Sequence, residues 1–285
     1  MIAVVEDFSG KVAVVTGASS GIGRGLAEHA ARQGMSVLIA DVDEEQLAVT
    51  HKQLADAGAK VASKRTDVSD AADVDALADT AWSEFGAAHV VFNNAGVMLG
   101  GLSWERSLED WQWVLGVNVW GVIHGMRSFI PRLIEQGGPA HVVNTASVAA
   151  LIAGPFLAPY LASKHAVLAI TESAHHELAL LKSDVRMSLL CPGAVKTGIA
   201  ESERIRPAAL ARQGNDGGVG EAFNAAVKAG IDEGTEPIEV ARFVFDQLRA
   251  NKFWLLPHPE FKRLVDKRMQ SMHDETNPVY ERDLV

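Results

Sequence analysis

Three polar residues in the middle of the chain could together move a proton. Tyr160 and Lys164 are four residues apart in a segment of helical period, so their side chains lie on one face of a helix. Ser147 lies thirteen residues before Tyr160, just beyond a predicted strand end, where parallel sheets place their ligands. An ammonium beside a phenol stabilises the phenolate. The pattern predicts an acid/base centre in which Ser147 orients a substrate oxygen.

Alcohol oxidation would use these three residue types, because a base must take the hydroxyl proton while a hydride leaves for a nicotinamide ring. Lowering the pKa of a phenol by about 3 requires roughly 4 kcal/mol, comparable with the attraction of unit charges at about 4 Å and an effective dielectric near 20. The alternative is a loop serine, a core aromatic and a surface lysine. The chain has only two tyrosines, and Tyr280 lies in a polar tail, which favours the catalytic interpretation.

A glycine-rich turn near the start of the chain predicts a phosphate site. The run T-G-A-S-S-G-I-G, residues 16–23, joins a predicted strand to an apolar helix. Gly17 suits a tight turn, Gly21 lets backbone approach a pyrophosphate, and Gly23 lets the helix pack close to the sheet. A simple strand-to-helix turn is the alternative, and the spacing departs from G-x-G-x-x-G. The predicted cofactor contacts here are Gly17, Ser19, Ser20, Gly21, Ile22 and Gly23.

Asp41 closes the second predicted strand about 20 residues further on, where a carboxylate can accept both ribose hydroxyls. The same carboxylate would repel the 2′-phosphate of NADP, so the cofactor is predicted to be NAD. Two observations leave room for other interpretations. Asp41 could instead cap the helix that begins near Asp43, and Arg24 is a basic residue close enough in sequence to receive a 2′-phosphate.

The elements that position these residues alternate between short β-branched runs and longer helical segments, which predicts βαβ units around a parallel sheet. The predicted strands are Lys11–Thr16, Met35–Ala40, Val61–Thr66, Ala88–Phe92, His141–Ala146, Val185–Leu190 and Phe253–Leu256. The predicted helices are Gly21–Gln33, Glu44–Ala57, Ala71–Phe85, Leu108–Gln136, Pro159–Lys182 and Pro237–Ala250.

No linker or internal repeat divides the chain, so residues 1–285 are predicted to form one dinucleotide-binding catalytic domain. Residues 199–236 are rich in Ala, Gly and polar residues and are expected to leave the sheet as a mobile substrate loop, or as a passive surface insertion. Residues 257–285 form a polar C-terminal extension that is expected to pack on a partner subunit or to fray.

Composition excludes several classes of protein. The 285 residues are 48% hydrophobic and carry a net charge of −10, which argues against a nucleic-acid partner. Cys191 is the single cysteine, so no intramolecular disulfide forms. The first residues lack the basic start of a secretory signal, so the cytoplasm is the expected location. The long uncharged stretch Gln136–Ser163 contains three prolines, which would interrupt a helix, and polar residues that a lipid-facing helix would bury. No membrane span is therefore expected.

The sequence does not favour a metal site or a serine hydrolase. None of the ten histidines forms H-E-x-x-H, and no metal is expected. Ser147 lacks the G-x-S-x-G context of a hydrolase nucleophile.

With these residues in place, the chain resembles the short-chain dehydrogenase/reductase family between about Lys11 and Thr197. The T-G-x-x-x-G-x-G turn resembles the family's phosphate loop, and the run N-N-A-G at residues 93–96 resembles a motif that stabilises the sheet and lines the cofactor. The resemblance implies that Asn118 completes a tetrad with Ser147, Tyr160 and Lys164 through a water-mediated relay to the lysine. It also implies further cofactor contacts at Asp67, Val68, Asn94, Ala95, Gly96, Tyr160, Lys164, Pro192, Gly193, Val195 and Thr197.

The family resemblance further implies an α/β fold of the Rossmann type, with a doubly wound seven-stranded parallel sheet and helices on both faces. It implies a homo-oligomer, a tetramer or dimer assembled through two long helices beginning near Leu108 and Pro159.

The predicted function is hydride transfer between NAD and a secondary alcohol or ketone with a bulky apolar or aromatic body. Apolar residues beside the catalytic positions in sequence suggest that body. An NADPH-dependent carbonyl reductase is the second candidate, and a non-catalytic dinucleotide-binding sensor is a third. The predicted substrate contacts are Met98, Ser147, Ala149, Phe156, Leu157 and Tyr160.

Overall fold

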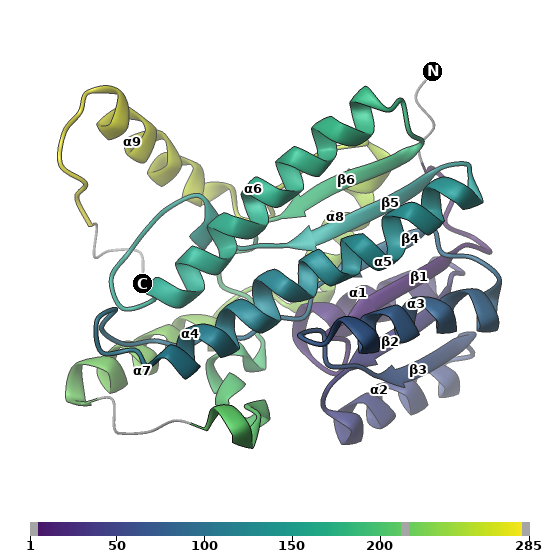
Figure 1. Cartoon of the computed structure of the whole chain (residues 1–285), viewed down its shortest axis with the longest axis horizontal. Coiled ribbons are helices and arrows are strands. Elements are labelled where there is room, and N and C mark those ends of the chain that lie inside the picture. Colours follow the sequence, from purple (N-terminus) through teal and green to yellow (C-terminus); the bar gives the residue numbers. More distant parts are fainter. Residues whose placement is uncertain (1–4, 212–216, 281–285) are drawn as a thin grey trace.

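A seven-stranded parallel sheet forms the centre of the molecule (Figure 1), in the computed structural model that describes residues 5–211 and 217–280. Its strand order is β3-β2-β1-β4-β5-β6-β7, and every pairing is parallel. The order reverses between β1 and β4, which is where doubly wound sheets bind ligands. The strands are β1 Val12–Thr16, β2 Ser36–Asp41, β3 Val61–Arg65, β4 Val90–Asn93, β5 Ala140–Thr145, β6 Val185–Leu190 and β7 Trp254–Leu255.

Helices cover both faces of this sheet and explain why its central strands are buried throughout. On one face, Val15 and Ile39 share a core with Leu26, Leu47 and Phe245. On the other, the alternate strand positions pack against the remaining helices in a second core. The first layer is α1 Gly21–Arg32, α2 Glu44–Asp56 and α8 Pro237–Arg249, and the second is α3 Ala71–Phe85, α5 Gly121–Gln136 and α6 Ala158–Leu180.

The predicted fold class is confirmed, and the predicted strands are present with their ends within two residues of the expected positions. The predicted helix Leu108–Gln136 differs. It divides into α4 Leu108–Leu115, the π-helix η1 Gly116–Trp120 and α5. The glycines in and after this π-helix allow neighbouring segments to pack closely against it. A Cβ on Gly121 would lie 2.8 Å from Val68, and one on Gly125 would lie 2.0 Å from Asn93.

The segment 199–236 is largely helical where the structure describes it, which differs from the predicted loop. The 3₁₀-helices η3 Gly198–Ile205 and η4 Ala208–Leu210 lead toward α7 Gly217–Asp232. Lys228 of α7 pairs with Glu201 of η3 at 2.5 Å. The glycine-rich residues 214–216, which suggested mobility, lie outside the described part of the chain.

The C-terminal extension contains η5 Pro259–Phe261 and the helix α9 Lys262–His273, which the sequence analysis did not predict. In Figure 1, α9 projects from the end of the molecule nearest α6. Among the described residues, no helix combines the length and apolar character needed to cross a bilayer.

Candidate active site

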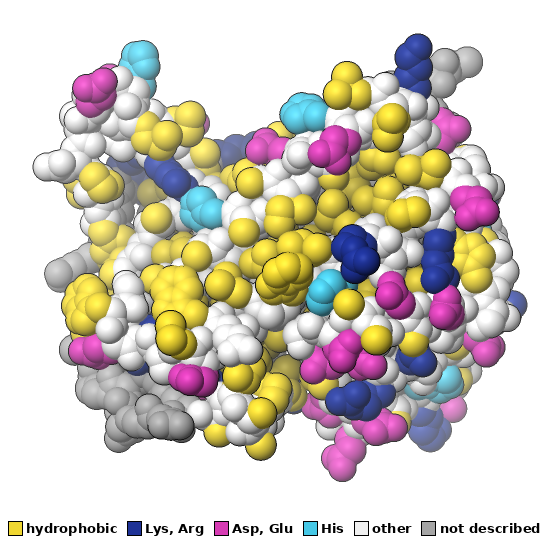
Figure 2. Space-filling view, viewed as in Figure 1, with side chains coloured by type: hydrophobic (Ala, Val, Ile, Leu, Met, Phe, Trp, Pro, Cys, Tyr) yellow, Lys and Arg dark blue, Asp and Glu magenta, His cyan; other side chains and the backbone are white. Residues whose placement is uncertain are grey.

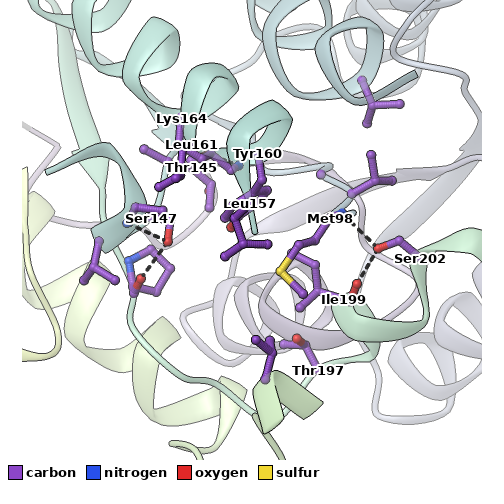
Figure 3. A pocket seen from close by; sticks show the side chains of 18 of the residues that line it. Met98, Thr145, Ser147, Leu157, Tyr160, Leu161, Lys164, Thr197, Ile199 and Ser202 are labelled. Atoms are coloured by element: carbon purple, nitrogen blue, oxygen red, sulfur yellow. Dashed lines mark hydrogen bonds between the residues drawn. The ribbon is translucent and has the colours of Figure 1, made fainter. Parts of the chain in front are cut away.

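The candidate site is a cavity of about 1180 Å³ at the carboxyl ends of the strands. Residues at or just after the ends of β1, β2, β4 and β5 line one part of it, and η3, α7 and α9 line another. A cavity of this size holds ligands larger than ordinary metabolites. Figure 3 shows the centre of the cavity, with Ser147 on one side of Leu157 and Tyr160 and with Met98 on the other.

The glycine turn is built as a cradle at the start of α1. Gly17 and Gly21 have φ angles of +66° and +53°, which L side chains rarely adopt. A Cβ on Gly23 would lie 2.0 Å from the Gly17 carbonyl oxygen, so this glycine packs the helix against the turn and does not line the cavity. Ser20, the N-cap of α1, makes no side-chain capping bond. Backbone N–H groups at this helix end are therefore available to an anion such as a pyrophosphate.

Asp41 lies at the cavity edge and is held by two backbone groups. Its Oδ2 accepts the Ser19 N–H at 3.0 Å, and its Oδ1 accepts the Asp43 N–H at 3.0 Å. The cap of α2 is Asp43 itself, whose side chain accepts the Gln46 N–H. Asp41 therefore ties the phosphate turn to the end of β2 and still presents a carboxylate to the cavity.

Arg24, the basic residue that could have favoured a 2′-phosphate, is engaged elsewhere. Its Nε donates to Glu28 at 2.9 Å along α1, and it does not line the cavity. The donors and acceptors around Asp41 thus suit a ribose with free hydroxyls.

The switch point between β1 and β4 is fixed by Thr16. Its hydroxyl accepts the N–H groups of Asn94 and Ala95 at 2.9 and 3.1 Å. The Asn94 side chain donates to the Thr16 carbonyl oxygen at 3.0 Å. A Cβ on Gly17 would lie 2.8 Å from Ala95, so the two strand ends are in close contact. These bonds hold the phosphate turn and the N-N-A-G run as one rigid unit.

Ser147, Tyr160 and Lys164 converge on the centre of the cavity. Ser147 follows β5, and its Oγ accepts the Ala149 N–H at 3.1 Å and lies 3.4 Å from the Pro192 carbonyl oxygen. Tyr160 and Lys164 come from the first turns of α6 and are 7% and 2% exposed. The Lys164 Nζ lies 5.5 Å from the centre of the Tyr160 ring and donates to the Thr145 carbonyl oxygen at 3.0 Å. The predicted juxtaposition is present.

The electrostatics of this pair differ from the prediction. Burial raises the pKa of the Tyr160 phenol to about 12, and a hydrogen bond with Ser147 offsets only part of that rise. Burial also lowers the pKa of the Lys164 ammonium to about 8. Burial thus disfavours the charged form of each group, which opposes the expected effect of Lys164 on the phenol.

Asn118 lies near Lys164 but does not line the cavity. Its side chain accepts the Val97 N–H at 2.8 Å and donates to the Val97 carbonyl oxygen and to the Ser163 Oγ, both at 2.9 Å. A Cβ on Gly96 would lie 3.4 Å from both the Asn118 Oδ1 and the Lys164 Nζ. The π-turn thus brings Asn118 close to Lys164, while the side chain itself braces the chain at Val97.

The predicted substrate residues divide into two groups. Met98, Ala149 and Leu157 line the cavity, whereas Phe156 is not part of its lining. Phe156 has a φ of +64°, and its ring packs on Phe223 at 5.2 Å between centroids. The remaining predicted cofactor residues line the cavity: Ser19, Ser20, Ile22, Asp67, Val68, Asn94, Ala95, Gly96, Pro192, Gly193, Val195 and Thr197.

The sequence analysis missed the cavity residues that follow β7. The helices η5 and α9 contribute Phe261, Leu264, Arg268 and Ser271 to the lining. Tyr280 also lines the cavity, and its ring lies 3.3 Å from where a Cβ on Gly154 would be. The spacing of 3, 4 and 3 between the first four is a helical stripe that sequence periodicity could have revealed.

Comparison with known proteins identifies what this arrangement resembles. A family profile described as short chain dehydrogenase matches residues 11–207. The chain is 34% identical over 277 residues to a CLA biosynthesis dehydrogenase/reductase of Lactiplantibacillus plantarum, covering 96% of this chain and 97% of that protein. It is 37% identical over 260 residues to 1-deoxy-11-beta-hydroxypentalenate dehydrogenase of Streptomyces exfoliatus, covering 90% and 86%.

Among solved structures, the chain matches a short chain dehydrogenase/reductase from Burkholderia phymatum in complex with NAD. The TM-score is 0.96 at 45% identity, and the match covers 98% of this chain and 99% of that one.

Proposed function

Because the chain belongs to the short-chain dehydrogenase family of oxidoreductases, we propose that it oxidises secondary alcohols with NAD. The observation that carries this proposal is the convergence of Ser147, Tyr160 and Lys164 in the cavity that also holds the glycine cradle. The bound NAD of the Burkholderia phymatum protein supports the choice of cofactor. The hydroxylated substrate in the name of the Streptomyces exfoliatus relative supports an alcohol.

In the proposed reaction, the anionic Tyr160 accepts the hydroxyl proton of the alcohol. The Ser147 hydroxyl donates a hydrogen bond to the same oxygen and holds it in line. Lys164, in its charged form, stabilises the phenolate, and its bond to Thr145 fixes the ammonium in place. When bound, NAD would supply the hydride acceptor and the positive charge of its oxidised ring.

Proton transfer away from Tyr160 is proposed to pass along Lys164 toward Asn118. The Asn118 Oδ1 and the Lys164 Nζ support this route, because both lie 3.4 Å from the position that a Cβ on Gly96 would occupy. The Asn118 Nδ2 donates to Val97 and Ser163 and the Oδ1 accepts one bond from the Val97 N–H, so the part of Asn118 in the relay is assigned to holding the π-helix η1 beside Lys164.

The substrate body is proposed to be bulky and apolar. Met98, Leu157 and Ile199 surround the reacting centre, and Leu264 and Val279 extend the apolar wall. Such a wall gains roughly 25 cal/mol for each Å² of apolar substrate surface that it removes from water. A secondary alcohol on a ring or a long hydrocarbon fits this lining.

Replacement of Tyr160 by Phe tests the assigned base. The ring and its packing remain, but the proton acceptor is lost, so kcat for secondary-alcohol oxidation should fall by at least about 10³-fold. Binding of NADH, followed by its fluorescence, should change by less than about threefold. Substantial turnover in the variant would show that another group is the base.

The choice of cofactor is tested by comparing kcat/KM with NAD and with NADP. Asp41 at the cavity edge and the pairing of Arg24 with Glu28 lead us to expect at least a tenfold preference for NAD. Asp41→Ser removes the repulsion of a 2′-phosphate and should narrow that preference. A wild-type preference for NADP would contradict the assignment and favour a reductase.

Assembly into a homo-oligomer is also proposed. Leu108 is 82% exposed and Trp120 is 54% exposed along the α4–α5 segment, and Leu180 at the end of α6 is 83% exposed. Figure 2 shows hydrophobic side chains gathered over this face. Apolar surface of this kind on a folded chain is typical of subunit contacts.

A further inference from the structure

One face of α9 is turned toward the substrate end of the cavity. Leu264, Arg268 and Ser271 line it at intervals of four and three residues, and Lys267 lies beside them. The opposite face carries Met269, which is 57% exposed. Figure 2 shows Lys and Arg side chains along the underside of α9, next to the hollow that separates this helix from α6. The helix therefore contributes both apolar and basic groups to the wall.

Arg268 is held over the cavity by neutral acceptors. Its Nη1 donates to the Leu151 carbonyl oxygen and to His165 Nε2, both at 2.8 Å. His165 Nδ1 bonds to the Leu161 carbonyl oxygen at 2.9 Å, so the proton of a neutral ring sits on Nδ1 and Nε2 is an acceptor. Within residues 5–211 and 217–280, no carboxylate forms an ion pair with Arg268. Its positive charge faces the cavity without a counterion from the described chain.

The described acidic residues of the cavity lie at one end, where the lining residue Arg204 is neutralised by its ion pair with Asp43 at 2.6 Å. The acidic side chains of the cavity among the described residues are Asp41 and Asp67, which follow β2 and β3 at one end of the strand order. Lys267 and Arg268 lie on α9, which follows β7 at the other end. Tyr160 and its partners lie between them. A ligand that spans from the catalytic centre toward α9 therefore enters a positive field, although the whole chain carries −10.

We infer that the substrate is an apolar secondary alcohol with a carboxylate at the end remote from the hydroxyl, and that Arg268 binds this carboxylate. The inference rests on the proposed function and names the substrate class of the same site. A guanidinium with unused N–H groups offers a carboxylate a paired, charge-assisted contact. Burial of the Arg268 guanidinium without an anion costs free energy of desolvation. A carboxylate on the substrate would offset this cost, whereas a neutral substrate would not.

Matched substrates test this inference with full-length enzyme and NAD. We would use 1-phenylethanols with a para carboxylate attached directly or through two or four methylenes, each paired with its primary amide. The amide has the same shape without the charge. We expect kcat/KM for the carboxylate to exceed that of its amide by about tenfold or more at one of the three lengths. Raising NaCl from 20 to 500 mM should reduce this ratio, because salt screens partly exposed charges.

Arg268→Gln should lower the carboxylate-to-amide ratio by about tenfold, chiefly through KM of the carboxylate. Arg268→Lys keeps the charge and should retain part of the ratio, which separates charge recognition from loss of the α9 attachment. Lys262→Gln is the matched control, since Lys262 is exposed on the same helix and does not line the cavity. It should keep the wild-type ratio.

The outcomes separate the two proposals. Amides oxidised as well as carboxylates at every length, or an unchanged ratio in Arg268→Gln, would overturn the anion site and leave the proposed function in place. Oxidation of none of the six alcohols would overturn the proposed function itself.

Discussion

At the residue scale, burial acts in opposite directions on the two groups of the proton-transfer pair. It raises the pKa of Tyr160 to about 12 and lowers that of Lys164 to about 8. With the Lys164 Nζ 5.5 Å from the Tyr160 ring centre, an effective dielectric near 20 gives an attraction of roughly 3 kcal/mol, or about two pH units in the phenol pKa. An attraction of this size would favour the phenolate, but it does not make Tyr160 a base at neutral pH while burial holds the phenol pKa near 12.

This balance predicts the pH profile of a lysine variant. Lys164→Met removes the cation, so the phenolate is less stable and the alkaline rise in kcat/KM for alcohol oxidation should move to higher pH by one to two units. At pH 7, where the phenolate form is then scarcer, kcat/KM should fall by at least about tenfold. Lys164→Arg keeps a positive charge and should move the rise by less than one unit. Identical profiles for the Met variant and the wild type would remove Lys164 from the mechanism.

Residue types and spacing were sufficient to predict that Ser147, Tyr160 and Lys164 lie together and that the glycine turn precedes a helix, because both depend on local geometry. Phe156 is not part of the cavity lining, for a reason that its position in the sequence does not reveal. Its backbone adopts φ +64°, its carbonyl oxygen accepts the Gly101 N–H at 2.7 Å, and the ring consequently turns onto Phe223. A positive φ at a bulky residue is set by tertiary contacts and leaves no pattern in the sequence.

At the scale of elements, β5 carries a buried ionisable residue within the sheet. His141 is 1% exposed, and its Nε2 lies 2.6 Å from the Ser188 Oγ of β6. Ser188 gives its hydroxyl proton to the Lys252 carbonyl oxygen, so the ring nitrogen must donate. Burial, reinforced by Arg186 and His175, lowers the pKa of His141 to about 3. The strand pair therefore requires a neutral imidazole.

Stability should fall as acid protonates this residue in the unfolded chain. Between pH 3 and about 6.5 the unfolded state binds one more proton than the folded state, so stability is retained above that window and is lost as pH falls through it. Lowering the pH from 7 to 5 should cost about 2 kcal/mol through this group. His141→Gln should reduce that loss correspondingly in urea unfolding. His273→Gln, an exposed control on α9, should not, and equal losses in all three proteins would contradict the argument.

The sequence predicted the sheet well because strands buried on both faces are continuous apolar runs. It did not predict the π-turn at Gly116–Trp120, because one extra residue in a helical turn leaves the apolar period almost intact. It also missed α7, whose Ala- and Gly-rich composition resembles a loop, and whose contacts with η3 include the Lys228–Glu201 pair. Helices that depend on such tertiary pairing have weak local signals.

At the scale of the whole molecule, the folded core and the substrate cavity end at different points in the chain. Within the part of the chain that the structure describes, the last buried hydrophobic residue is Leu255, and α9 contains no buried residue. Phe261 still belongs to the body of the protein, since a Cβ on Gly193 would lie 2.5 Å from its ring. Beyond it, the chain contributes to the cavity while adding little to the core.

A chain that ends at Phe261 should therefore separate cofactor binding from substrate binding. All seven strands and both cores lie before that point, so the thermal midpoint should fall by only a few degrees and NADH affinity should change by less than about threefold. Loss of Leu264 and the segment around Tyr280 opens the substrate end to water, so kcat/KM for apolar secondary alcohols should fall at least about tenfold, mainly through KM. Fluorescence titration with NADH and steady-state kinetics on the same preparation measure both quantities. Parallel losses of NADH and alcohol affinity would show that the extension supports the whole fold, and unchanged kinetics would show that it lies outside the substrate site.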